Sequence, residues 1–201
     1  MPQNRERLFV VSTKGESTFE EPNSFPSDTR IEDVLENEIE DNRYVKKDYK
    51  CLESVDLSYS ERLIHKVAYV PYAKNPEKVH QSNTIYHPKG ISPAVYRDHE
   101  KQPLMVLEAN SDELANPYRI RRLSALEHWR LTGFSDDDYS KASNVCSKTQ
   151  IYRQVGNSIA LPVIECIFYK LFKGTEFLIG KMTSNIKRML SCSKEFQPSF
   201  N

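Results

Sequence analysis

The sequence is short of glycine and has none of the glycine-rich loops that hold phosphates or nucleotides. It contains six glycines in 201 residues, and no two of them are spaced as G-x-G. Its four cysteines form no C-x-x-C pair, and none of them follows a proline. The five histidines lack metal-ligand spacing. We therefore expect reduced thiols and no bound metal, and we find no complete active site in the sequence.

Long hydrophobic runs are also missing. No apolar stretch approaches the roughly 20 residues that cross a membrane. Polar and charged residues occupy positions 4–7, where a signal peptide would carry its apolar core. These absences predict a cytoplasmic protein without a membrane segment.

Charge is balanced in total but not along the chain. Residues 1–60 carry 8 basic and 14 acidic side chains, and residues 61–201 carry 20 basic and 14 acidic ones. The first part therefore has a net charge of −6 and the second a net charge of +6. A basic part can bind a polyanion although the whole chain is neutral, but ordinary solvated charge explains the same asymmetry.

The first two thirds of the chain indicate strands joined by loops. Apolar runs predict strands at 6–12, 104–108 and 118–123. The first of them is expected to be buried, because all its residues from Leu8 to Val11 are apolar. Asp28 can cap a short helix over 29–38, whose apolar face would carry Ile31, Val34 and Leu35. Prolines and histidines interrupt short apolar segments between 60 and 103, which indicates a loop-rich mixed or β module.

Helices are predicted mainly after residue 120. Two serines are followed three residues later by Glu or Gln, which is the spacing of a capping box, in the pairs Ser124–Glu127 and Ser147–Gln150. These pairs predict helices over 124–131 and 148–155, which Gly133 and Gly156 would end. Apolar residues at helical spacing predict a third helix over 158–172.

Two segments are candidates for binding chemistry. In QNRER, Arg5 and Arg7 share one face of the predicted strand, and paired guanidiniums can hold phosphates or the polar edge of a base. Two surface arginines at a strand end are the alternative. In QVGNSIALP, Gly156 allows a tight turn or a close backbone approach, and Asn157 and Ser158 precede a helix whose free amides suit a carboxylate. A helix-to-helix turn with a serine cap fits that segment equally well.

The segment RRLSALEHWRLTGF has an architectural pattern and shows no catalytic requirement. Arg121 or Arg122 can order the following turn by pairing with Glu127 or with a backbone carbonyl. Leu126 and Trp129 are candidate core residues. We expect this segment to join the loop-rich module to the C-terminal helices.

These three segments, in this order, resemble the C-terminal part of a DNA cytosine-5 methyltransferase. PQNRERLFVV resembles the family's motif VIII, which is Q-x-R-x-R followed by a strand. RRLSALEHWRLTGF resembles motif IX, with Ser124 where Thr is usual, and QIYRQVGNSIALPVIECI resembles motif X. NTIYHPKGISPAVYRDHEKQPLMVLE resembles the late part of the target-recognition domain, which the family keeps between motifs VIII and IX. The resemblance covers residues 2–172.

The resemblance implies an α/β fold, namely the C-terminal part of a Rossmann-like methyltransferase fold plus a loop-rich mixed or β target-recognition module. It also implies a division of the chain. The end of the catalytic domain would occupy 1–58, the target-recognition module 59–118, motifs IX and X 119–172, and a polar tail 173–201.

The resemblance further implies roles for single residues. Arg7 matches the arginine that faces the flipped target cytosine, and Gln3 and Arg5 match residues that contact the DNA backbone and organise the pocket. The motif X residues that line the S-adenosylmethionine site match Asn157, Ser158 and Ile159. Candidate DNA contacts in the recognition module are Lys74, Lys78, Lys89, Arg97 and Lys101.

Three family parts have no counterpart in the sequence: the first glycine-rich cofactor loop, the Pro-Cys loop that holds the nucleophile, and the Glu-Asn-Val segment. We therefore expect a bacterial or phage-encoded C-terminal subunit or fragment of a split restriction–modification methyltransferase, inactive alone. Its expected partners are double-stranded DNA and a separate N-terminal methyltransferase subunit, with S-adenosylmethionine as cofactor of the completed enzyme. A stand-alone, non-catalytic DNA-binding module and an inactive gene remnant are the alternatives.

Overall fold

The computed structural model describes residues 2–12, 19, 22, 28–52, 56–58, 63–97, 99–110 and 117–171. The chain divides into two compact units. The first comprises 1–5 and 28–158, and the second comprises 6–27 and 159–201. Each unit is described by itself. The predicted polar tail at 173–201 lies outside the described residues.

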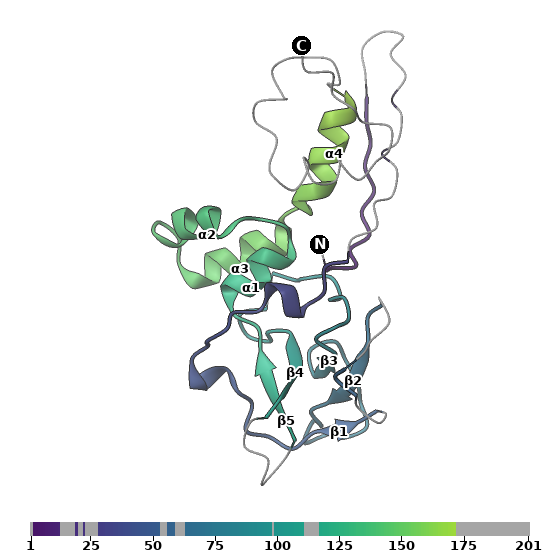
Figure 1. The fold of residues 1–201 in the computed structure, drawn as a ribbon, viewed down its shortest axis with the longest axis vertical. Coiled ribbons are helices and arrows are strands. Elements are labelled where there is room, and N and C mark those ends of the chain that lie inside the picture. Colours follow the sequence, from purple (N-terminus) through teal and green to yellow (C-terminus); the bar gives the residue numbers. More distant parts are fainter. Residues whose placement is uncertain are drawn as a thin grey trace. The chain divides into compact units, whose positions relative to one another are not determined.

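The first unit is built on a mixed sheet of five strands (Figure 1). The strands are β1 (Lys50–Cys51), β2 (Lys66–Tyr69), β3 (Thr84–Tyr86), β4 (Met105–Ala109) and β5 (Tyr118–Arg122). They lie in sequence order, with β3 and β4 parallel and the other neighbours antiparallel. The predictions of strands at 104–108 and 118–123 are confirmed. The two short strands β2 and β3 and the long loops around them agree with the loop-rich module expected between 60 and 103.

Successive residues of a strand point to opposite faces of a sheet. The apolar side chains of the strands therefore belong to two hydrophobic clusters, one on each face. One cluster combines sheet and helix residues, among them Tyr86, Val106, Leu123, Trp129 and Val155. The other lies on the opposite face and contains Val67, Ala68, Ile85, Met105, Leu107 and Ile120, with Val45 and Tyr49 packed against it. The sheet with its helices confirms the α/β class.

Three α-helices follow β5: α1 (Ala125–Leu131), α2 (Asp136–Ser143) and α3 (Lys148–Asn157). Each begins with a capping box, at Ser124–Glu127, Ser135–Asp138 and Ser147–Gln150. Gly133 follows α1 with a φ of 91°, which side chains rarely tolerate. α3 continues through Gly156, beyond the predicted end. α2 was not predicted, because none of its residues is buried and its apolar pattern is therefore weak.

The predicted helix over 29–38 is only a single 3-10 turn, η1 (Glu32–Val34). Ile31 and Val34 are buried and Leu35 packs against the same cluster, so the predicted apolar face is confirmed. The N–H groups of Ile31 and Glu32 donate to carbonyls at 88–90 instead of continuing a helix. A second 3-10 turn, η2 (Asp41–Arg43), follows.

The second unit contains α4 (Leu161–Leu171), which begins three residues later than the predicted helix over 158–172. Pro162 lies in its first turn, where proline is tolerated. The predicted buried strand at 6–12 is wrong. These residues have no assigned strand, and Leu8 and Val10 are 90% and 82% exposed. A strand needs a hydrogen-bonded neighbour, and the pairing of this segment stops at Gln3, in the first unit. None of the described helices has the length and apolarity needed to cross a bilayer.

Candidate functional site

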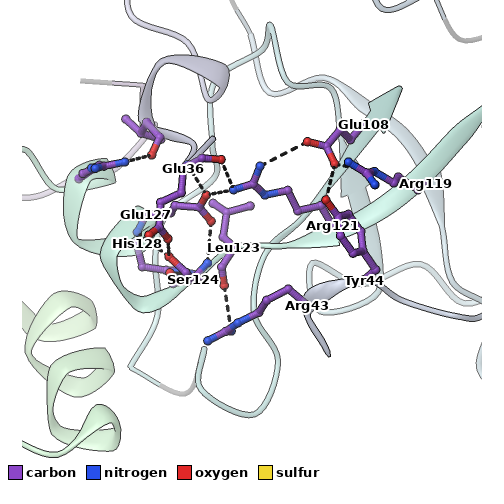
Figure 2. Close-up of polar contacts among 12 residues, drawn as sticks. Glu36, Arg43, Tyr44, Glu108, Arg119, Arg121, Leu123, Ser124, Glu127 and His128 are labelled. Atoms are coloured by element: carbon purple, nitrogen blue, oxygen red, sulfur yellow. Dashed lines mark hydrogen bonds and ion pairs between the residues drawn. The ribbon is translucent and has the colours of Figure 1, made fainter. Parts of the chain in front are cut away.

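A buried ion pair joins the sheet to the first helix. Arg121 on β5 is 2% exposed, and Glu127 in the first turn of α1 is fully buried. The Arg121 guanidinium donates to the Glu127 carboxylate and to the backbone oxygen of Glu36 at 2.9 Å, and it pairs with Glu108 on β4 at 3.3 Å (Figure 2). We call these four residues the Arg121–Glu127 network. It ties β4, β5, α1 and the segment after η1 together.

The carboxylate of Glu127 has its remaining acceptor sites filled by backbone amides. The N–H of Glu36 and the N–H of Ser124 each donate to it at 2.7 Å. Burial raises the pKa of Glu127, while these amides and the positive charge of Arg121 oppose that rise. The prediction that Arg121 or Arg122 pairs with Glu127 is confirmed for Arg121.

The end of α1 is anchored in two directions by Arg130. Its guanidinium donates to the backbone oxygen of Val34 at 3.0 Å and forms an ion pair with Asp136 at 2.5 Å. Trp129 is buried, as predicted, whereas Leu126 is half-buried. The contacts of this segment with η1, the sheet and α2 agree with the architectural role expected for it.

His128 is a structural residue that no pattern in the sequence indicated. It is fully buried, and its Nδ1 lies 2.6 Å from the backbone oxygen of Ser124. Its ring lies edge-on to His99 and Tyr152, with centroids 5.0 and 5.2 Å away. Burial lowers the pKa of His128 to about 3, so the ring is neutral at pH 7.

The segment at 2–5 pairs with the loop that contains Ser92. Gln3 and Ser92 form a parallel bridge, in which the Asn4 N–H donates to the Ser92 oxygen at 2.8 Å and the Ser92 N–H donates to the Pro2 oxygen at 2.7 Å. Gln3 is 7% exposed, and its side-chain amide has no hydrogen-bond partner among the described residues. Buried side-chain amides without a hydrogen-bond partner are uncommon in folded proteins.

Arg5 clamps this segment to two others. Its guanidinium donates to the backbone oxygen of Val95 at 3.2 Å and to that of Gly156 at 2.7 Å. A Cβ atom on Gly156 would lie 2.1 Å from the Arg97 backbone nitrogen, so only glycine allows this approach. Of the two roles considered for Gly156, the structure supports the close backbone approach. Arg5, Gly156 and Arg97 therefore meet at one junction of the first unit.

Ser158 ends a helix where the sequence suggested that it opens one. Its N–H donates to the Gln154 oxygen at 2.8 Å, and its hydroxyl donates to the Val155 oxygen at 2.8 Å. It is thus the C-cap of α3, which matches the alternative of a turn with a serine cap. Asn157 ends α3 with an exposed side chain, and the Ser158 oxygen keeps lone pairs that can accept hydrogen bonds. Both groups can hold a small polar ligand. Ile159 is exposed and lies in the second unit.

Arg7 lies in the second unit, whereas Arg5 lies in the first. Arg7 is exposed and donates to the backbone oxygen of Glu6 at 2.9 Å. The shared strand face predicted for the two arginines is not present, because 6–12 is not a strand.

The basic residues predicted in the recognition module lie on loops of the first unit. Lys74, Lys78, Arg97 and Lys101 are exposed. Lys89 is half-buried, and its ammonium donates to the Ser58 backbone oxygen at 2.6 Å. Among the described residues, no group of three or more His, Cys, Asp or Glu is placed to hold a metal ion.

A family model described as C-5 cytosine-specific DNA methylase matches residues 1–173. The chain belongs to this family. The resemblance of the three ordered segments to DNA cytosine-5 methyltransferases is thereby confirmed, and the family's substrate is DNA.

Methyltransferases of bacteria and phages are similar to this family member. Type II methyltransferase M2.ScrFI of Lactococcus lactis subsp. cremoris is 29% identical over 177 residues, which are 86% of this chain and 42% of the relative. Type II methyltransferase M.SsoII of Shigella sonnei is 30% identical over 178 residues, which are 85% and 41%. Orphan methyltransferase M.SPBetaI of Bacillus phage SPbeta is 51% identical over 55 residues, which are 27% and 12%. The chain thus spans about two fifths of the two longer matches.

A solved structure, that of S. pombe Dnmt2 methyltransferase, aligns with this chain at a TM-score of 0.44 and 20% identity. The alignment covers 74% of this chain and 43% of that one.

Proposed function

We propose that these 201 residues are the C-terminal, DNA-recognising part of a DNA cytosine-5 methyltransferase, which transfers a methyl group from S-adenosylmethionine to cytosine C5 in DNA. The junction at Arg5 is the observation that supports this best. There the motif VIII segment binds Val95, in the proposed recognition module at 59–118, and Gly156, in motif X. A base-flipping enzyme needs its base pocket and its sequence-reading module held in a fixed relation.

In this proposal Arg7 faces the flipped cytosine, and its exposed guanidinium is available for that contact. Gln3 and Arg5 organise the pocket, and two carbonyl contacts of Arg5 support a positioning role. The DNA contacts of the recognition module are Lys74, Lys78, Lys89 and Arg97. The end of the catalytic domain lies at 1–58, and motifs IX and X lie at 119–172.

S-adenosylmethionine, when bound, supplies the methyl group. We assign one edge of its site to Asn157, Ser158 and Ile159, since the exposed Asn157 amide and the Ser158 oxygen suit the charged amino-acid end of that cofactor. No cysteine of the sequence follows a proline. We therefore propose that the nucleophile and the rest of the cofactor site come from residues outside these 201, on a separate N-terminal methyltransferase subunit in a bacterial or phage cytoplasm.

The test joins these 201 residues to the part of a type II relative that precedes its match to this chain, first as one polypeptide and then as two mixed proteins. Transfer of labelled methyl groups to duplex DNA, with 5-methylcytosine as product, is expected from the fusion and from the mixture. Neither protein alone should show it. Arg7→Ala in the fusion should abolish transfer while cofactor binding remains.

A fusion that binds both S-adenosylmethionine and DNA but makes no 5-methylcytosine would contradict the proposal.

One observation favours a second candidate, a DNA-binding module that acts alone: the first unit has its own hydrophobic clusters and its own buried ion-pair network. Salt-dependent DNA binding by the isolated chain, without transfer in either arrangement, would select that candidate.

A further inference from the structure

Open hollows lie beside the segment that pairs with the outer edge of β5. The segment at 44–45 extends the sheet there, since the Val45 N–H donates to the Ile120 oxygen at 3.0 Å and Tyr44 bridges to Arg121. Three hollows, of about 720, 410 and 140 Å³, adjoin this segment, and all three share Val45 and Lys47 in their walls. Two of them also reach Val70 and Pro71, which follow β2. Because all three hollows share these two residues, we treat them together and call them the Lys47 groove.

Two adjacent arginines of β5 face opposite ways. Arg121 is turned to the sheet face of Val106 and enters the Arg121–Glu127 network. Arg122 lies opposite Met105 in the register of β4 and β5, and the Met105 side chain belongs to the other hydrophobic cluster. Arg122 lines two of the hollows. Because side chains alternate along a strand, Arg121 points to the interior and Arg122 lines the Lys47 groove.

The Lys47 groove is basic. Its walls carry the cations Lys46, Lys47, Lys101, Arg119 and Arg122 and the anions Asp41 and Asp48. Arg119 is paired with Glu108 at 2.8 Å, but no ion pair between described residues engages Lys46, Lys47 or Arg122. Lys46 and Lys47 lie within residues 1–60, whose net charge is −6. An excess of basic residues in that part of the sequence therefore does not account for the basic walls of the groove.

Hydroxyl groups stand beside these cations. Tyr72 and Ser82 line the smallest hollow, and their oxygens lie 2.6 Å apart. Both residues belong to the stretch that also carries Lys74 and Lys78, and Lys101 lines the same hollow. An open row of cations with hydroxyl donors suits a linear polyanion, because duplex DNA presents phosphates at regular intervals along each strand.

We infer that the Lys47 groove binds the phosphate backbone of duplex DNA outside the recognised sequence, through Lys46, Lys47 and Arg122. This inference rests on the proposed function and extends it, since the sequence placed none of these three residues at DNA. Contacts to phosphates carry affinity without base preference, so the groove contributes equally to all sequences.

The experiment measures binding of the full 201-residue chain to labelled duplex DNA at several salt concentrations, with two unrelated sequences. The groove variants are Lys46→Gln with Lys47→Gln, and Arg122→Gln. The matched control is Lys66→Gln with Lys141→Gln, which removes two exposed charges that line none of the three hollows. Fluorescence of Trp129, the single tryptophan, verifies folding.

The double groove variant should make the slope of log affinity against log salt shallower by roughly 2, and Arg122→Gln by about 1, for both DNA sequences alike. The control should follow the unchanged chain. Equal slopes in groove and control variants would overturn the inference and leave the proposed function standing. If the unchanged chain shows no salt-dependent DNA binding, the DNA-recognising part of the proposed function fails, and the inference fails with it.

Discussion

The two units satisfy their side chains in different ways. In the first unit, the buried charges Arg121 and Glu127 have partners from four segments, and apolar residues pack on both faces of the sheet. In the second unit, Leu8 and Val10 are 90% and 82% exposed, while Ile167 on α4 is buried. The first unit thus buries charged and apolar groups together, whereas segment 6–12 of the second unit leaves the apolar side chains of Leu8 and Val10 exposed. Stability of the first unit should therefore respond to single substitutions far more than that of the second.

Removal of the buried carboxylate is the most severe test of the first unit. Glu127→Gln leaves the Arg121 charge buried with only Glu108 as a charged partner, and we expect a loss of about 3 kcal/mol in unfolding free energy. Urea unfolding followed by Trp129 fluorescence measures it. Asp137→Asn is the matched control, because it breaks the exposed pair with Lys141 and should have little effect. A similar small loss for both variants would show that the network does not hold the unit together.

Gly156→Ala tests the junction of α3 with the loop at Arg97. Alanine ordinarily stabilises a helix relative to glycine. Here the added Cβ would meet the Arg97 backbone nitrogen at 2.1 Å, so the backbone must move and we expect a loss of about 2 kcal/mol. Arg153→Ala, at an exposed position of the same helix, should stay within about 0.5 kcal/mol. A stabilised Gly156→Ala chain would contradict the close approach.

His128 gives the first unit a dependence on acid. Its folded pKa is about 3, below the ordinary value of 6.5, so the unfolded chain binds a proton at pH values between them and the folded chain does not. The stability from neutral His128 is complete above pH 6.5 and is lost as the pH falls toward 3, by about 1.4 kcal/mol at pH 5.5. The difference between the original chain and His128→Asn, from urea unfolding at pH 7.5 and 5.5, isolates this term. Parallel pH profiles would exclude it.

Sequence patterns predicted the elements that local chemistry determines. The capping serines Ser124 and Ser147 located α1 and α3, and apolar runs located β4 and β5. The prediction at 6–12 was wrong, because a strand is made by its neighbour and the sequence of one segment does not show whether that neighbour is present. α2 was missed, since its capping box lacks a buried apolar face.

The candidate site shows the same division between local and distant information. The pairing of Arg121 with Glu127 was among the predicted options, because the two residues lie six positions apart. The contacts of Arg5 with Val95 and Gly156 join residues 90 and 151 positions away, and no pattern in the sequence indicated them. Whether the assigned DNA and cofactor contacts are correct stays a prediction for the fusion experiment.

Arg5 in the first unit and Arg7 in the second allow the two units to be compared by single substitutions. Arg5→Lys keeps the charge but cannot bridge the carbonyls of Val95 and Gly156, so we expect a loss of about 1 kcal/mol in unfolding free energy. Arg7→Lys should leave the free energy of unfolding unchanged, since the side chain of Arg7 is exposed and donates to the adjacent backbone oxygen of Glu6. The two variants carry the same chemical change two residues apart, so each is the control for the other. Equal losses of unfolding free energy would mean that Arg7 is also held by packing. They would contradict the expected difference between the two units.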